Sequence, residues 1–183
     1  MLFQTLGVSA AEGQTSSAEK RSFTTVEWTE LIPADDLDAL LNPPQAIADI
    51  EDGSWEDQIS QQVQNSLAAA SDGAYQQALV STRVVADMDG RAIRIPGFVV
   101  PLEFNDDQAV TQFFLVPYFG ACIHVPPPPP NQIILVNYPQ GMAFQGIQDP
   151  LWISGMLRAS IQHNDVATAA YVMDMAQFET YTE

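Results

Sequence analysis

The fold is decided by residues 79–100, LVSTRVVADMDGRAIRIPGFVV, where the spacing of the apolar side chains becomes strand-like. Apolar and β-branched residues alternate with polar ones in residues 80–85 and again in residues 93–100. Between the two runs stands Asp89-Gly90, a pair that supplies the positive φ angles of a tight turn. The stretch therefore predicts a β-hairpin with one face turned toward the core.

Three further strands are predicted at residues 113–116, 132–137 and 151–157, each next to turn-forming residues. Residues 167–175 are ambiguous, because alanine favours a helix whereas Tyr171-Val172-Met173 favours a strand. Five or six short strands with helices gathered near the N-terminus predict an α+β class that is mainly antiparallel β. The expected architecture is a small barrel of the oligonucleotide-binding (OB) type or a strongly bent sheet.

Two helices are predicted ahead of the strands. The first spans residues 34–41, with two aspartates at its positive N-terminal end and Asn42-Pro43-Pro44 to stop it. The second begins at a capping box, Ser54-x-x-Asp57, and carries an apolar stripe at every fourth position: Trp55, Ile59, Val63 and Leu67. Four aromatic residues are expected to lie in the core: Trp55, Phe113, Phe119 and Trp152.

The chain divides into an N-terminal arm and one domain. Residues 1–25 hold few large apolar groups, so they are expected to be a disordered arm or the remnant of a signal peptide. Residues 26–183 are expected to form a single domain, with a helical part at 26–78 and a β core at 79–178. The small residues Ser9-Ala10-Ala11 resemble a signal-peptidase site, so a periplasmic or otherwise exported location is expected, with a cytoplasmic one left open.

Charge excludes several classes of partner. The 183 residues include 23 Asp and Glu against 6 Lys and Arg, a net charge of -17. Such a surface repels nucleic-acid phosphates and anionic lipid headgroups, and it attracts cations. The longest apolar run, residues 113–125, is interrupted by proline and glycine and is too short for a membrane-spanning helix. Neither a nucleic acid nor a transmembrane segment is expected, and the oligomeric state is left open.

The clearest chemical signal is the pair Cys122 and His124, which includes the only cysteine and one of two histidines. Alternate residues of an extended segment point to one face, so this thiol and this imidazole can converge on one metal ion. A tetrahedral zinc site needs further ligands, for which His163 and Glu103 are the candidates. Two other interpretations stay open: Cys122 is a nucleophile activated by His124, or both side chains are structural.

A proline run follows directly. Pro126, Pro127, Pro128, Pro129 and Pro130 are expected to form a stiff left-handed extended rod that ends at Asn131. Such a rod can dock on aromatic side chains of a partner, which makes these six residues candidates for partner binding. It can equally be a rigid connector that closes one end of the barrel.

Three segments resemble an uncharacterised bacterial family, a domain of unknown function: IPGFVVPLE at 95–103, FLVPYFGACIHVPPPPPNQ at 114–132 and ISGML at 153–157. The resemblance covers about residues 80–175. It implies a small exported or lipid-anchored protein, often associated with transporter components and in some cases with zinc-responsive genes. It carries over only Cys122 and His124, as a suspected metal pair, and no catalytic activity.

The leading hypothesis is an exported accessory or binding protein that is not an enzyme. Its expected cofactor is zinc and its expected partner is a membrane transporter complex. Two alternatives remain, a structural interaction module that uses the proline run and an enzyme that depends on Cys122.

Overall fold

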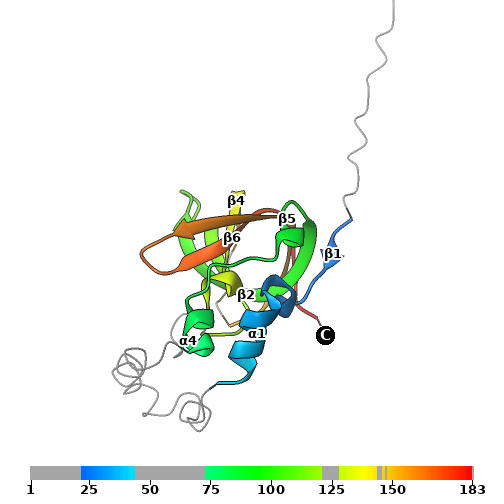
Figure 1. The fold of residues 1–183 in the computed structure, drawn as a ribbon. Helices are drawn as coiled ribbons and strands as arrows, with labels where there is room; N and C mark the ends of the chain where they lie inside the picture. The colour runs from blue at the N-terminus through cyan, green and yellow to red at the C-terminus, as the bar shows by residue number, and fades with distance from the viewer. Residues whose placement is uncertain (1–21, 44–72, 121–127, 144–145, 147, 183) are drawn as a thin grey trace, which may run out of the picture.

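Five long strands curl into a barrel, and two short helices lie side by side beneath it (Figure 1). The computed structural model describes residues 22–43, 73–120, 128–143, 146 and 148–182. The strands are β1 (Thr24–Thr25), β2 (Ala92–Phe104), β3 (Val110–Val116), β4 (Ile134–Met142), β5 (Leu151–His163) and β6 (Thr168–Thr180). The α-helices are α1 (Ala34–Leu41) and α4 (Ala74–Leu79), and the 3-10 helices are η1 (Trp28–Leu31), η2 (Ala86–Met88) and η3 (Pro130–Gln132).

The sheet closes on itself. Its strand order is β1-β2-β3-β4-β6-β5, and β2 also pairs with β5, so the five long strands form a closed barrel. The pairs of β2 with β3, β3 with β4, β2 with β5 and β5 with β6 are antiparallel, whereas β4 and β6 run parallel. The prediction of a small, mainly antiparallel barrel is therefore confirmed.

Closure depends on Gly97. Strand β2 pairs with β5 as far as Gly97, opposite Leu151, and with β3 from Phe98, opposite Val116. A Cβ atom on Gly97 would lie 2.8 Å from the Val116 carbonyl oxygen and 2.9 Å from Leu115 Cγ. Only glycine lets the strands approach this closely where β2 passes from one neighbour to the other.

The barrel interior is filled by alternating residues of the five strands. On β2, for example, Ile93, Ile95, Gly97 and Val99 are buried, while Arg94, Pro96 and Phe98 between them are partly exposed. Tyr171 of β6 is the largest of the fully buried side chains. Its hydroxyl donates to the Leu31 carbonyl oxygen at 3.0 Å and accepts from the Val85 amide at 2.8 Å. One side chain thereby fastens two N-terminal segments to the barrel.

The predicted hairpin is wrong in its first half. Helix α4 ends at Leu79, and residues 81–85 run without strand pairing into η2. Their backbone groups bind side chains instead: the Val85 amide donates to Tyr171, and the Arg83 carbonyl oxygen accepts from Asn131. A tight turn does form here, with the Arg91 amide donating to the Met88 carbonyl oxygen at 3.4 Å. Only Gly90 of the predicted pair has a positive φ, +74°, whereas Asp89 has φ -66°.

The structure confirms some of the other expectations and corrects others. The helix at 34–41 is confirmed as α1, and all but the first of the ambiguous residues 167–175 belong to β6. Thr24–Thr25 pairs with β2, so ordered structure begins ahead of the expected boundary at residue 26. Phe119 is 44% exposed, so its placement in the core was wrong.

The second predicted helix, with the stripe from Trp55 to Leu67, lies outside the described residues. Within the part of the chain that the structure describes, no helix is long and apolar enough to cross a membrane.

Replacing Gly97 tests the closure of the barrel. We expect Gly97→Ala to lower the free energy of unfolding by about 1–3 kcal/mol, because the added methyl group meets the backbone of β3. Urea denaturation measures the change. Gly146→Ala is the control, since a Cβ there has no atom within 4 Å. Equal stability of the two variants would contradict the assigned role of Gly97.

Removing one hydroxyl tests the fastening by Tyr171. Tyr171→Phe keeps the ring but leaves the Val85 amide and the Leu31 carbonyl oxygen without their bond, so we expect a loss of about 2 kcal/mol in the free energy of unfolding. Tyr138→Phe is the matched control, because the Tyr138 hydroxyl has no hydrogen-bond partner among the described residues. A loss of the same size in both variants would contradict the account.

Candidate functional site

A pocket of about 400 Å³ opens where three segments distant in sequence meet. One wall is the end of α4 with the chain that follows it, the second is the end of the proline run, and the third is the turn between β5 and β6. Most of the lining side chains are apolar: Leu79, Val80, Thr82, Pro128, Pro130, Ile133, His163, Val166, Ala167 and Thr168. Pockets of this size and character commonly hold small ligands.

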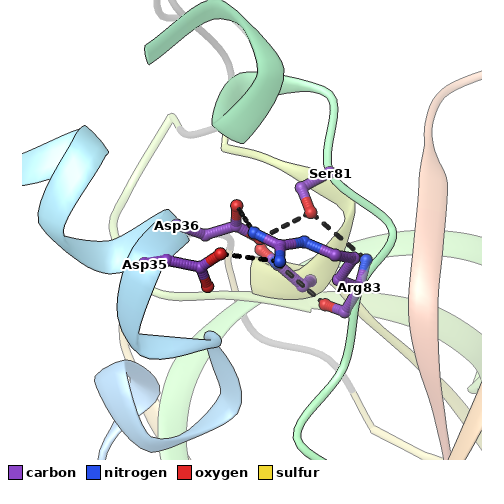
Figure 2. Close-up of polar contacts among 5 residues, drawn as sticks. Asp35, Asp36, Ser81 and Arg83 are labelled. Carbon is purple, nitrogen blue, oxygen red and sulfur yellow. Dashed lines mark hydrogen bonds and ion pairs between the residues drawn. The ribbon is translucent and has the colours of Figure 1, made fainter. Parts of the chain in front are cut away.

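The α4 wall is held by a cluster of charges (Figure 2). From α1, Asp35 and Asp36 both point at the Arg83 guanidinium, which donates to Asp35 at 2.7 Å and also pairs with Asp36. Ser81 donates its hydroxyl to Asp36 at 2.6 Å and accepts the Arg83 amide at 3.2 Å. Because Leu79, Val80 and Thr82 alternate with these residues, the cluster sets the position of this wall.

The charges of the cluster support each other. Asp36 is buried, and its carboxylate is satisfied by Ser81 and Arg83 together. The hydrogen bond from Arg83 lowers the pKa of Asp35 below its usual 3.8, and hydrogen bonds to both aspartates raise the pKa of Arg83. The ion pairs and hydrogen bonds of the cluster therefore hold α1 against the pocket wall.

The proline wall is built from residues predicted to bind a partner. Pro128 and Pro129 are buried and Pro130 is half-buried at the start of η3. Asn131 is fully buried, and its amide donates to the Arg83 carbonyl oxygen at 3.0 Å. Asn131 therefore lies inside the protein, which corrects the expectation that this residue faces a partner. Pro126 and Pro127 lie outside the described residues.

The third wall presents a histidine. His163 is the last residue of β5 and stands opposite Thr168 in the register of β5 and β6. Its Nδ1 lies 3.1 Å from the Thr168 hydroxyl oxygen, which fixes the ring and leaves Nε2 as the nitrogen available to a ligand. A histidine oriented in this way through its other nitrogen is a common metal ligand.

The predicted metal ligands are only partly described. Cys122 and His124 lie outside the described residues. Glu103 is an exposed residue near the end of β2 and does not line the pocket, so it is not joined to His163. Among the residues that the structure describes, no three histidine, cysteine, aspartate or glutamate side chains gather as a metal site.

Sequence reasoning missed the other lining residues. Val80 and Val166 are exposed to 72% and 57%, which is unusual for valine. Val80 was expected in a strand, and nothing in the sequence pattern joins residues 79–82 to the turn at 164–167. These residues are recognised as parts of one site only in the three-dimensional structure, where the three walls meet.

The comparisons with known proteins agree on a family. A family model described as "Protein of unknown function (DUF3299)" matches residues 28–180. The crystal structure of a DUF3299 family protein from Pseudomonas aeruginosa PAO1 has 32% sequence identity and a TM-score of 0.63, and the match covers 89% of this chain and 99% of that chain.

A small single-stranded DNA-binding protein from Streptomyces coelicolor has 13% identity and a TM-score of 0.31, with 51% of this chain and 95% of that chain covered. A likeness this weak supports no conclusion. None of the curated proteins compared with the chain is significantly similar to it.

The charge cluster predicts a pH dependence. A carboxyl group with a lowered pKa in the folded state stabilises that state above its unfolded pKa, and this contribution is lost as the pH falls through the folded value. We therefore expect Asp35→Asn to reduce the urea midpoint at pH 7. The difference from wild type should begin to shrink as the pH falls below about 3.8, and it should vanish only below the lowered pKa that Asp35 has in the folded protein.

Asp38→Asn on the same helix is the control for this measurement. Asp38 accepts a hydrogen bond from Asn42 and has no arginine partner in the described part of the chain. If Asp35→Asn and Asp38→Asn gave the same profile of urea midpoint against pH, the role of Arg83 would be refuted.

Proposed function

The chain belongs to the DUF3299 family, and from that premise we propose that it is an exported binding protein and not an enzyme. In this proposal the protein takes up a divalent metal ion such as zinc, and it serves as an accessory to a membrane transporter. One observation carries the proposal. His163 and the prolines Pro128 and Pro130, two features singled out from the sequence, line the same pocket.

Chain connectivity relates the pocket to the cysteine and histidine pair. His124 precedes Pro128 by four residues and Cys122 precedes it by six. An extended chain covers at most about 3.5 Å per residue, so the connecting segments are short enough for both ligands to reach the proline wall in the proposed site. One thiolate and two imidazoles are a ligand set that zinc accepts, and a fourth position is left open for water or an exchanging ligand. An open position suits transfer of the ion better than permanent structural binding.

The electrostatics favour a cation. A net charge of -17 raises the local concentration of divalent ions and speeds their encounter with the protein. The lining of the pocket itself contains no Lys or Arg, and His163 is the only described lining residue with an ionisable side chain. The long-range field would therefore bring a cation close, and the imidazole would bind it.

We also propose that the barrel is of the OB type. Five strands close with a parallel β4–β6 pair among antiparallel ones, which fits that topology. OB barrels bind ligands at their loops, including the loop between the fourth and fifth strands. The corresponding loop here is residues 164–167, between β5 and β6, and it contributes Val166 and Ala167 to the pocket.

Calorimetric titration of the purified full chain with zinc tests the metal proposal. We expect binding by the wild type, its loss in Cys122→Ser and His124→Ala, and about tenfold weaker binding in His163→Gln, because each change removes one ligand. Glu103→Gln is the control and should bind as the wild type does, because Glu103 does not line the pocket.

Two results would refute the proposal. If the wild type did not bind zinc, the proposed metal-handling function would be wrong. If His163→Gln bound zinc with full affinity, the pocket would not be part of the metal site. Absence of zinc together with rapid alkylation of Cys122 near neutral pH would instead favour a thiol-dependent enzyme.

A further inference from the structure

A second cleft lies at the other end of the β5–β6 hairpin from the His163 pocket. There β5 begins at Leu151, opposite Thr180 of β6, whereas His163 and Thr168 pair at the far end. The cleft has a volume of about 240 Å³. Its walls consist of aromatic and proline rings around one glycine: Trp28, Pro96, Gly97, Phe98, Pro117, Pro150 and Tyr181.

The walls of this aromatic cleft are fixed before any ligand arrives. Tyr181 stacks on Trp152, with ring centroids 5.3 Å apart, and the Arg94 guanidinium lies 3.9 Å from the centroid of the Trp152 ring. Trp28, another lining residue, donates its indole N–H to the Pro96 carbonyl oxygen at 2.6 Å. Aromatic rings held by stacking and hydrogen bonds lose little entropy on binding.

The lining matches an extended proline-containing segment. Left-handed proline helices have no internal hydrogen bonds, and they dock their rings against aromatic-lined grooves. Their bare carbonyl groups require donors from the protein. The Tyr181 hydroxyl is such a donor, since it has no hydrogen-bond partner among the described residues and the side chain is 36% exposed.

The charge next to the cleft selects a basic ligand. In the sequence, Glu27 and Glu30 lie on either side of Trp28 and Asp149 precedes Pro150, and all three residues are exposed. Glu30 also accepts the Glu27 amide at 2.7 Å. The nearby cation, Arg94, is neutralised by Glu179 at 2.9 Å. Aromatic clefts also stack nucleobases, but these carboxylates and the net charge of -17 repel phosphates.

We propose that the aromatic cleft binds an extended, proline-containing segment of a partner protein that carries Lys or Arg beside its prolines. The proline rings lie against Tyr181 and Phe98, the Tyr181 hydroxyl donates to a backbone carbonyl group of the ligand, and its basic residues face Asp149 and Glu30. This site is separate from the pocket assigned to metal binding, so neither proposal depends on the other.

Fluorescence anisotropy with labelled decapeptides tests the proposal on the full chain. The first probe alternates proline and alanine between terminal arginines. The second replaces the prolines by glycine, the third replaces the arginines by glutamate, and a labelled ten-nucleotide thymidine strand serves as the nucleic-acid probe. We expect the first probe to bind at least about tenfold more tightly than the other three.

Variants locate the binding. Tyr181→Ala should weaken binding of the first probe about tenfold and Tyr181→Phe about threefold, because the second change removes only the hydroxyl. Asp149→Asn should weaken binding of the first probe, which carries arginines. It should not weaken the binding of the glutamate probe, which is already weak in the wild type. Val166→Ser, in the His163 pocket, is the control and should bind as the wild type does.

Tyr181 follows the end of β6 and is partly exposed, so its variants are expected to fold, which circular dichroism checks. The proposal is overturned if no probe binds at millimolar concentration, if Tyr181→Ala binds as the wild type does, or if the glycine or thymidine probe binds as tightly as the first.

Discussion

A short unpaired stretch of backbone, residues 81–85, is held by side chains rather than by a neighbouring strand, and the arrangement of the molecule depends on it. The Tyr171 hydroxyl binds the Val85 amide, and the Asn131 amide binds the Arg83 carbonyl oxygen. Buried backbone groups need partners as much as those in a sheet do. Because the partners come from β6 and η3, the stretch fixes the helical part of the chain against the barrel at a defined position.

The His163 pocket follows from this arrangement. Residues 79–82 form one wall only because Arg83 is bound on one side by the aspartates of α1 and on the other by Asn131. Asn131 in turn places the end of the proline run opposite, and the hairpin of β5 and β6 completes the site with His163. Three segments far apart in sequence are thus held together by polar contacts on the sides that face away from the pocket. Mostly apolar side chains are left to line the pocket.

Much of the barrel could be predicted from the sequence, because alternation marks β2 and the turn residues mark the turn at Gly90. Helix α1 could also be predicted, because aspartates mark its N-terminal end and Pro43 follows its C-terminal end. The prediction of the first hairpin strand was wrong for a physical reason. Alternation in residues 80–85 indicates an extended chain with one buried side, and it does not say whether the backbone binds a strand or side chains. Phe119 and Trp152 misled in the same way: an aromatic residue predicts burial, but Phe119 is largely exposed and Trp152 forms part of a surface stack.

We propose that the metal ion binds in this pocket, whose walls are set by the side-chain bonds of residues 81–85. Anomalous diffraction at the zinc absorption edge, from crystals of the full chain grown with one equivalent of zinc, tests it most directly. We expect one strong peak about 2.1 Å from the Nε2 atom of His163, beside Pro128 and Pro130. A peak remote from His163, or no peak from a crystal in which the pocket is well ordered, would contradict it.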